Sequence, residues 1–225
     1  MKTKKKFIFT MVFLPAVMFS FMGTSRFDCG PVIEPPWEEW TLGEFETRAA
    51  KAEPKLYDFI AVHLKTPSEA DKLDAGCFAS IAKVLNDNAG KKFSIDMGTC
   101  EFKDSTITSV PERAFENCNG QLLYLYLPPQ ITHIGKKAFA GFTKLGYIVE
   151  GYKIEAIGDE AYKGCTGIWY DYIPDTVTTM GKNVFEGWTS EQRIKINFEE
   201  GKLPDGWDED WDKGCDAIIK YKGEW

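Results

Sequence analysis

Hydrophobic and polar residues follow a pattern that recurs along the second half of the chain. One phrase, Ile-x-x-Val-Pro-x-x-Ala-Phe-x-x-Cys, begins at Ile107. It returns with small changes at Ile131, Ile154 and Val177, so the starts lie 24, 23 and 23 residues apart. A fixed period of this size dictates the architecture, because each unit buries its apolar face only by stacking on its neighbours.

Each phrase is followed by a short run with the alternation of a strand. Leu125, Leu127, Ile148 and Ile194 are expected to point into the core, and their neighbours then point outward. A further run of the same kind precedes the first phrase. The pattern predicts five parallel strands, at 93–97, 122–127, 145–150, 168–173 and 193–196.

The units resemble the BspA-like leucine-rich repeats of bacterial surface proteins. In those repeats an isoleucine pair, a glycine, an Ala-Phe pair and a Gly-Cys come in this order, as in Ile134-Gly135-x-x-Ala138-Phe139 and Ile157-Gly158-x-x-Ala161-Tyr162. The resemblance covers about residues 80 to 221, and the entry to the first strand is similar to that of spirochaete members. It implies an α/β solenoid: a short leucine-rich-repeat stack with one parallel sheet, a helical N-terminal cap and a C-terminal cap.

Some positions depart from the repeat. Pro111 replaces the glycine in the first unit, and Phe142 and Trp188 replace the spine cysteine. Glu150 and Asp171 occupy strand positions that are apolar and inward in the other units. A buried carboxylate needs a partner or must take up a proton, so we expect a local twist or bulge to turn both outward.

Caps must cover the apolar ends of a solenoid. Helical spacing predicts three N-terminal helices, at Leu42 to Ala52, Pro54 to Leu64 and Ala75 to Asn88. At the other end, Trp207 and Trp211 are expected to pack on the last coil. The acidic stretch 205–212 lacks the glycine and glutamate spacing of a calcium loop, so no metal is expected.

The N-terminus has the pattern of an export signal: a lysine-rich start, an apolar run from residue 7 to 22, and small residues ending at Ser25. Lipidation at Cys29 is an alternative anchor, although Arg26 and Asp28 fit that signal poorly. The expected location is therefore the cell surface, the periplasm or the extracellular space. The predicted division is 1–25 signal peptide, 26–40 linker, 41–90 helical N-terminal cap, 91–190 solenoid, and 191–225 last strand and C-terminal cap.

Composition narrows the function further. The net charge of -7 argues against nucleic acid or anionic lipid as the main partner. The six cysteines match no metal spacing, and the two histidines, His63 and His133, have no catalytic motif around them. We expect a protein that is not an enzyme and needs no cofactor. The rival enzyme hypothesis is a hydrolase that uses Glu150 and Asp171 as a carboxylate pair.

A binding surface is predicted on the concave side of the sheet. In register, the outward residues form two columns, one from Ser94 to Arg193 and one from Asp96 to Lys195. Tyrosine and arginine dominate binding hot spots, although tyrosine also stabilises sheets. The expected partner is a host, matrix or cell-surface protein; an envelope scaffold and a carbohydrate-binding module are the alternatives. The candidate binding residues are Tyr124, Tyr126, Tyr147, Tyr170, Tyr172, Arg193 and Lys195.

Overall fold

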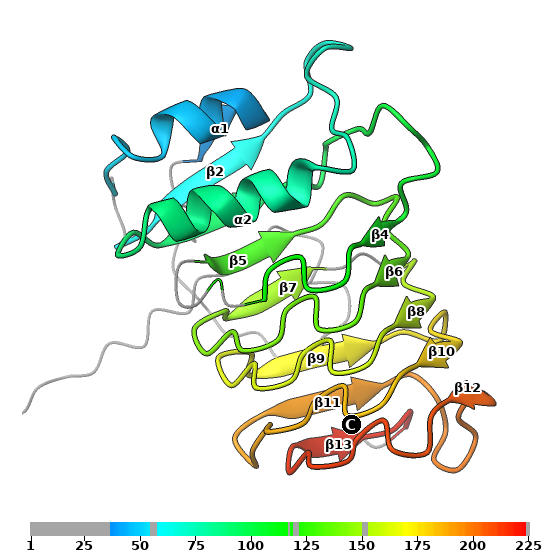
Figure 1. Ribbon diagram of the computed structural model, residues 1–225. Coiled ribbons are helices and arrows are strands. Elements are labelled where there is room, and N and C mark those ends of the chain that lie inside the picture. Colours follow the sequence, from blue (N-terminus) through cyan, green and yellow to red (C-terminus); the bar gives the residue numbers. More distant parts are fainter. Residues whose placement is uncertain (1–36, 55–57, 117, 119–121, 150–152, 224–225) are drawn as a thin grey trace, which may run out of the picture.

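The fold is a stack of coils, each of which gives a longer strand to one side (Figure 1). The computed structural model describes residues 37–54, 58–116, 118, 122–149 and 153–223. The predicted signal peptide (residues 1–25), Cys29 and Glu150 lie outside these residues. Within them, no helix is long and apolar enough to cross a membrane.

The longer strands are parallel and belong to two sheets. The first sheet has the order β1-β2-β3-β5-β7, and the second has the order β9-β11-β13. The five strands predicted from the repeat are all present. The bounds are β1 Glu38–Trp40, β2 Ile60–Leu64, β3 Phe93–Asp96, β5 Leu122–Tyr126, β7 Tyr147–Val149, β9 Tyr170–Ile173, β11 Arg193–Ile196 and β13 Ile218–Lys220.

The longer strands line one side of the stack as predicted, but no pairing joins β7 to β9 among the described residues, so their hydrogen bonds form two sheets. In the regular ladder, the backbone N–H of Arg193 donates to the carbonyl of Trp169 on the preceding strand. Tyr172 holds a position of the same parity on β9, and its N–H donates to the Asp171 carboxylate at 2.9 Å.

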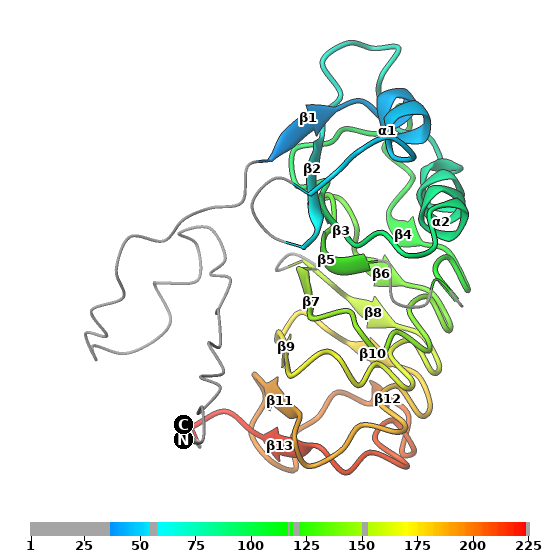
Figure 2. The same cartoon turned by 90° about the vertical axis from the view of Figure 1, so that its left-hand side faces the viewer.

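Short strands on the other side of the stack form a second ladder, with the order β12-β10-β8-β6-β4 (Figure 2). The N–H groups of Gly135, Gly158 and Gly181 each donate to a carbonyl of the preceding coil, at 2.8–2.9 Å. Pro111 stands at the same position in the first unit, where β4 is the edge of the sheet and no preceding strand needs a donor. The bounds are β4 Ser109–Val110, β6 His133–Ile134, β8 Ala156–Ile157, β10 Thr179–Met180 and β12 Gly206–Trp207.

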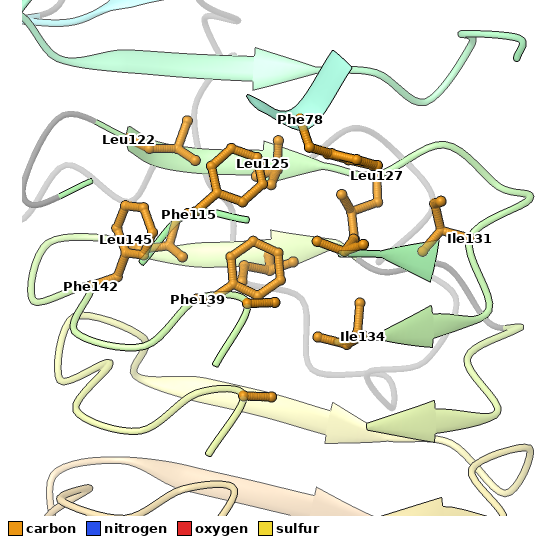
Figure 3. Packing of buried hydrophobic residues seen from close by; sticks show 14 of the residues in the cluster. Phe78, Phe115, Leu122, Leu125, Leu127, Ile131, Ile134, Phe139, Phe142 and Leu145 are labelled. Carbon is orange, nitrogen blue, oxygen red and sulfur yellow. The ribbon is translucent and has the colours of Figure 1, made fainter. Parts of the chain in front are cut away.

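An aromatic stack runs through the core, with one ring from each unit. Figure 3 shows its first two rings, Phe115 and Phe139. The rings of Phe115, Phe139, Tyr162 and Phe185 follow one another with centroids 5.4, 5.7 and 5.7 Å apart. Their planes lie within 15° of parallel. This repeated contact explains why the aromatic of the Ala-Phe pair recurs in every unit.

The spine position beside this stack also carries a repeated hydrogen bond. The Cys165 thiol donates to the Phe139 carbonyl at 2.9 Å, and the Trp188 indole donates to the Tyr162 carbonyl at 2.9 Å. Trp188 therefore keeps the donor role of the cysteine that it replaces. The five described cysteines are free, and four of them are buried.

The N-terminal cap combines helices with strands. Helices α1 (Leu42–Arg48) and α2 (Cys77–Asp87) lie within two of the predicted ranges. The third predicted helix, Pro54 to Leu64, was wrong, because Ile60–Leu64 is β2 and pairs with β3. The inward side chains of β2 are those at alternate positions, Ile60, Val62 and Leu64. A short apolar run fits the period of a helix and of a strand alike, and only its hydrogen-bonded partner shows which of the two it forms. Strand β1 likewise lies inside the predicted linker and extends the sheet.

At the C-terminal end, two tryptophans close the core. Trp207 and Trp211 are buried, with ring centroids 5.2 Å apart. Trp211 also meets Phe185, the last ring of the stack, edge to face at 6.2 Å. The exposed apolar end of the last coil is thereby covered.

Candidate functional site

The outward side of the longer strands, here called the strand face, carries two rows of side chains. In the first row, Ser94, Tyr124 and Tyr147 are aligned on the first sheet, and Tyr170 and Arg193 are aligned on the second. In the second row, Tyr126 follows Asp96, and Tyr172 is followed by Lys195. The structure therefore brings the candidate residues together as two groups: Tyr124, Tyr126 and Tyr147 on one sheet, and Tyr170, Tyr172, Arg193 and Lys195 on the other.

Two tyrosines of the first sheet, Tyr124 and Tyr126, contact the N-terminal segment. The Phe59 ring lies 6.2 Å from the Tyr124 ring, and the Trp37 ring meets the Tyr126 ring edge to face at 6.4 Å. Burial raises the pKa of the Tyr124 hydroxyl, and Tyr147 is buried as well. Much of this aromatic surface is therefore used inside the chain, so the second sheet offers the accessible part of the strand face.

The second sheet and the residue before it carry further exposed side chains that were not among the predicted binding residues. Trp169 is 51% exposed, and its ring lies 5.8 Å from the ring of Tyr170. Ile218 is 38% exposed and pairs with Arg193, while Lys220 pairs with Lys195. The β-branched pair Ile218-Ile219 was a signal for a further strand. Trp169 lies directly before β9, and its sequence context does not distinguish it from a core residue; its exposure in the structure does.

Tyr170 and Tyr172 border the cations of this sheet. Burial, together with the nearby Asp171 and Tyr172, raises the pKa of the Tyr170 hydroxyl to about 12. A hydroxyl with such a pKa stays protonated at neutral pH, so it can donate a hydrogen bond to an acceptor on a partner.

Asp171 points inward rather than outward, which corrects the expectation of a local twist. It pairs with Ile194, a fully buried residue, and the next residue of the same parity, Ile173, is also buried. Burial raises the pKa of the Asp171 carboxyl to about 6. Its hydrogen bond from the Tyr172 N–H compensates part of the cost of burial. The paired acid of the hydrolase hypothesis, Glu150, lies outside the described residues.

Charge along the strand face changes sign from one end to the other. At the N-terminal end, Glu39 pairs with Lys65, and the His63 ring lies 3.8 Å from the Asp96 carboxylate. At the C-terminal end, β11 and β13 present Arg193, Lys195 and Lys220. The charged side chains on the described strands at this end of the strand face are therefore cationic.

The two histidines and the acidic C-terminal stretch make hydrogen bonds to neighbouring residues of the chain. His63 contacts the Thr99 hydroxyl at 3.0 Å, and His133 contacts the Thr132 hydroxyl at 2.7 Å. Asp208 accepts a hydrogen bond from the Asp210 N–H at 3.0 Å. Among the described residues, no three His, Cys, Asp or Glu side chains are grouped so as to hold a metal ion.

The comparison with protein families agrees with this architecture. A family model described as BspA type Leucine rich repeat region (6 copies) matches residues 62–192, more than half of the chain. The chain belongs to the BspA-type leucine-rich-repeat family. Repeats of this family form scaffolds for protein–protein interaction and are typically not catalytic.

One solved structure is also similar. It is the crystal structure of the T. pallidum leucine-rich-repeat protein TpLRR, at 22% identity and a TM-score of 0.40. The similarity covers 58% of this chain and 53% of that one, so this BspA-type chain matches about half of the length of that protein. No curated protein matches the chain.

Proposed function

We propose that this BspA-type protein is exported and binds a host, matrix or cell-surface protein through its strand face. The observation that carries the proposal is the alignment of Tyr170 and Tyr172 with Arg193 and Lys195, beside the exposed ring of Trp169. Tyrosine, tryptophan and arginine are the residues that contribute most to binding energy at protein interfaces. Their rigid rings contribute contact area at little cost in conformational entropy.

Export is supported by the charged start, apolar run and small residues of the first 25 residues. Proteins of this family are commonly exported or located at the bacterial surface. Protease treatment of whole cells tests the location: a surface protein is cleaved, whereas an envelope scaffold, the first alternative, is protected until the cells are broken. Substitution of Cys29 by serine separates a lipid anchor from a soluble form, since only a lipidated protein would lose its partition into detergent.

Ligand binding is tested by a pull-down with the chain against extracellular-matrix proteins and glycans. The double variant Trp169→Ala/Tyr170→Ala should lose capture of the protein ligand, with circular dichroism unchanged. A matched control, His133→Ala/Thr179→Ala, alters exposed residues of β6 and β10 on the other side of the stack. Unchanged capture by the tryptophan–tyrosine variant would overturn the proposed site.

The second alternative, a carbohydrate-binding module, is favoured by one observation. The exposed Trp169 ring and the neighbouring Tyr170 ring, 42° apart in plane, provide an aromatic surface on which a sugar could stack. Retention of glycans but not of proteins in the same pull-down would select this alternative.

A further inference from the structure

The cations of β11 and β13 stand out on an acidic protein. The chain has a net charge of -7, yet the outward residues of these two strands are Arg193, Lys195, Ile218 and Lys220. The only acid of β9, β11 and β13, Asp171, stands at the inward position that pairs with Ile194 and is partly buried. The strand face of the second sheet therefore has a surplus of positive charge with no outward carboxylate on its own strands.

The spacing of these charges follows the geometry of a strand. Arg193 and Lys195 are two residues apart on β11, so they point to the same side about 6.6–6.8 Å apart. An extended partner chain has the same repeat, and its alternate side chains also lie on one side. Carboxylates at positions i and i+2 of such a chain can thus meet both cations, and arginine can hold one of them with two hydrogen bonds.

The adjacent strand supplies the remaining contacts. Tyr170 is paired with Arg193, and Tyr172 is paired with Lys195, so each cation has a tyrosine beside it on a strand whose backbone runs about 4.8 Å away. The protonated Tyr170 hydroxyl can donate to a carboxylate, and the Trp169 ring can cover the apolar stem of a glutamate. Both features suit a chain of acidic residues better than an apolar segment.

We infer that the strand face of β9, β11 and β13 binds an extended acidic polypeptide segment with carboxylates at alternate positions. The inference rests on the proposed function and names the chemistry of its partner. A second copy of this chain is disfavoured because the acids at the other end of the strand face are already engaged, Glu39 by Lys65 and Asp96 by the Gly98 N–H. A sulfated glycan shares the charge but lacks the backbone repeat of a strand.

Fluorescence anisotropy with a labelled ten-residue peptide of alternating glutamate and serine tests the inference. The peptide should bind the full chain, more weakly as salt is added, and a peptide of alternating glutamine and serine should not bind. In Arg193→Gln/Lys195→Gln, the dissociation constant should rise by about tenfold or more. The control Lys51→Gln/Lys103→Gln removes the same charge from exposed positions outside β9, β11 and β13 and should leave the dissociation constant unchanged.

Several results would overturn the inference. One is an absence of binding by the glutamate peptide, and another is equal affinity in the Arg193→Gln/Lys195→Gln variant. Binding of heparin without binding of the peptide would assign the cations to a sulfated glycan. A dimer in sedimentation that the variant abolishes would assign them to a second copy. If the peptide fails while Trp169→Ala/Tyr170→Ala still abolishes capture of a protein ligand, the acidic partner is rejected and the proposed function stands.

Discussion

Asp171 on β9 lies opposite Ile194 on β11, so a carboxylate occupies a position that the neighbouring coil fills with a buried aliphatic side chain. The repeat tolerates it because the carboxylate accepts the backbone N–H of Tyr172. The same hydrogen bond coincides with the break between the two sheets. One departure in an otherwise regular repeat is thereby associated with both a partly buried carboxylate and the break between the two sheets.

Asp171→Asn should stabilise the fold in a pH-dependent way. Burial raises the pKa of Asp171 to about 6, above its value of about 3.9 in an unfolded chain. The folded state therefore holds the proton more tightly, and the stability that this group contributes is present below about pH 4 and lost as the pH rises through about 6. The variant should gain about 1–3 kcal/mol at pH 7.5 and little at pH 4.

Urea unfolding of both proteins at the two pH values measures this difference. Asp205→Asn, at an exposed position, serves as the control and should change the free energy of unfolding only slightly, by the same amount at both pH values. A gain for Asp171→Asn that is the same at pH 4 and pH 7.5 would contradict the assignment.

Tyr162→Phe should stabilise the aromatic stack. The Tyr162 hydroxyl is buried and has no hydrogen-bond partner among the described residues, whereas its neighbours in the stack are phenylalanines. Removal of an unsatisfied buried hydroxyl should raise the free energy of unfolding by about 1 kcal/mol. Thermal denaturation provides the measurement, and a lower midpoint for the variant would indicate an overlooked partner.

The reverse change, Phe139→Tyr, serves as the companion experiment. It adds a hydroxyl to a ring that is fully buried in the same stack. We expect a loss of about 1–3 kcal/mol.

Gly158→Ala should destabilise the contact between coils. A Cβ at this position would lie 2.6 Å from the backbone nitrogen of Lys136 on the preceding coil, so one coil would have to shift. We expect a loss of about 1–3 kcal/mol in chemical denaturation. Gly43→Ala is the matched control, because a Cβ there meets nothing within 4 Å and lies in helix α1. It should stabilise the protein by about 0.5–1 kcal/mol; similar effects at both glycines would refute the packing argument.

Lys163→Met should reveal an ionic contact between coils. The Lys163 ammonium lies 3.2 Å from the Glu160 carboxylate and 2.7 Å from the Glu186 carboxylate of the next unit. The variant should lose about 0.5–1 kcal/mol at low salt and less in 1 M salt, where such pairs are screened. Lys202→Met, which breaks one exposed pair with Glu199, should have almost no effect. Unfolding curves at two salt concentrations make the comparison.

The parts that the sequence predicted are those in which local pattern and repetition agree. The period placed the strands from β3 to β11, because equivalent residues in successive coils must contact one another. It also gave the alignment of Tyr124 with Tyr147 and of Tyr170 with Arg193. These pairings follow from side-chain alternation once the register is known.

The errors fall where the pattern has no repeat to support it. Ile60 to Leu64 carries an apolar spacing that fits a helix, and only the partner strand β3 makes it β2. The inward direction of Asp171 depended on a backbone hydrogen bond that has no signature in sequence. The covering of Tyr124 by Phe59 joins residues 65 positions apart, which no local pattern reports.

The glycines of the short-strand ladder show how repeat units can be added to this protein in evolution. Gly135, Gly158 and Gly181 make the same hydrogen bond to the coil before them, and Pro111 marks the coil where this chain of bonds begins. A repeat unit inserted between two of these coils would contact one coil on each side, and both contacts would be the same as those between existing units. Duplication of a gene segment encoding 23 residues would therefore lengthen the strand face by one strand, about 4.8 Å, without altering either cap.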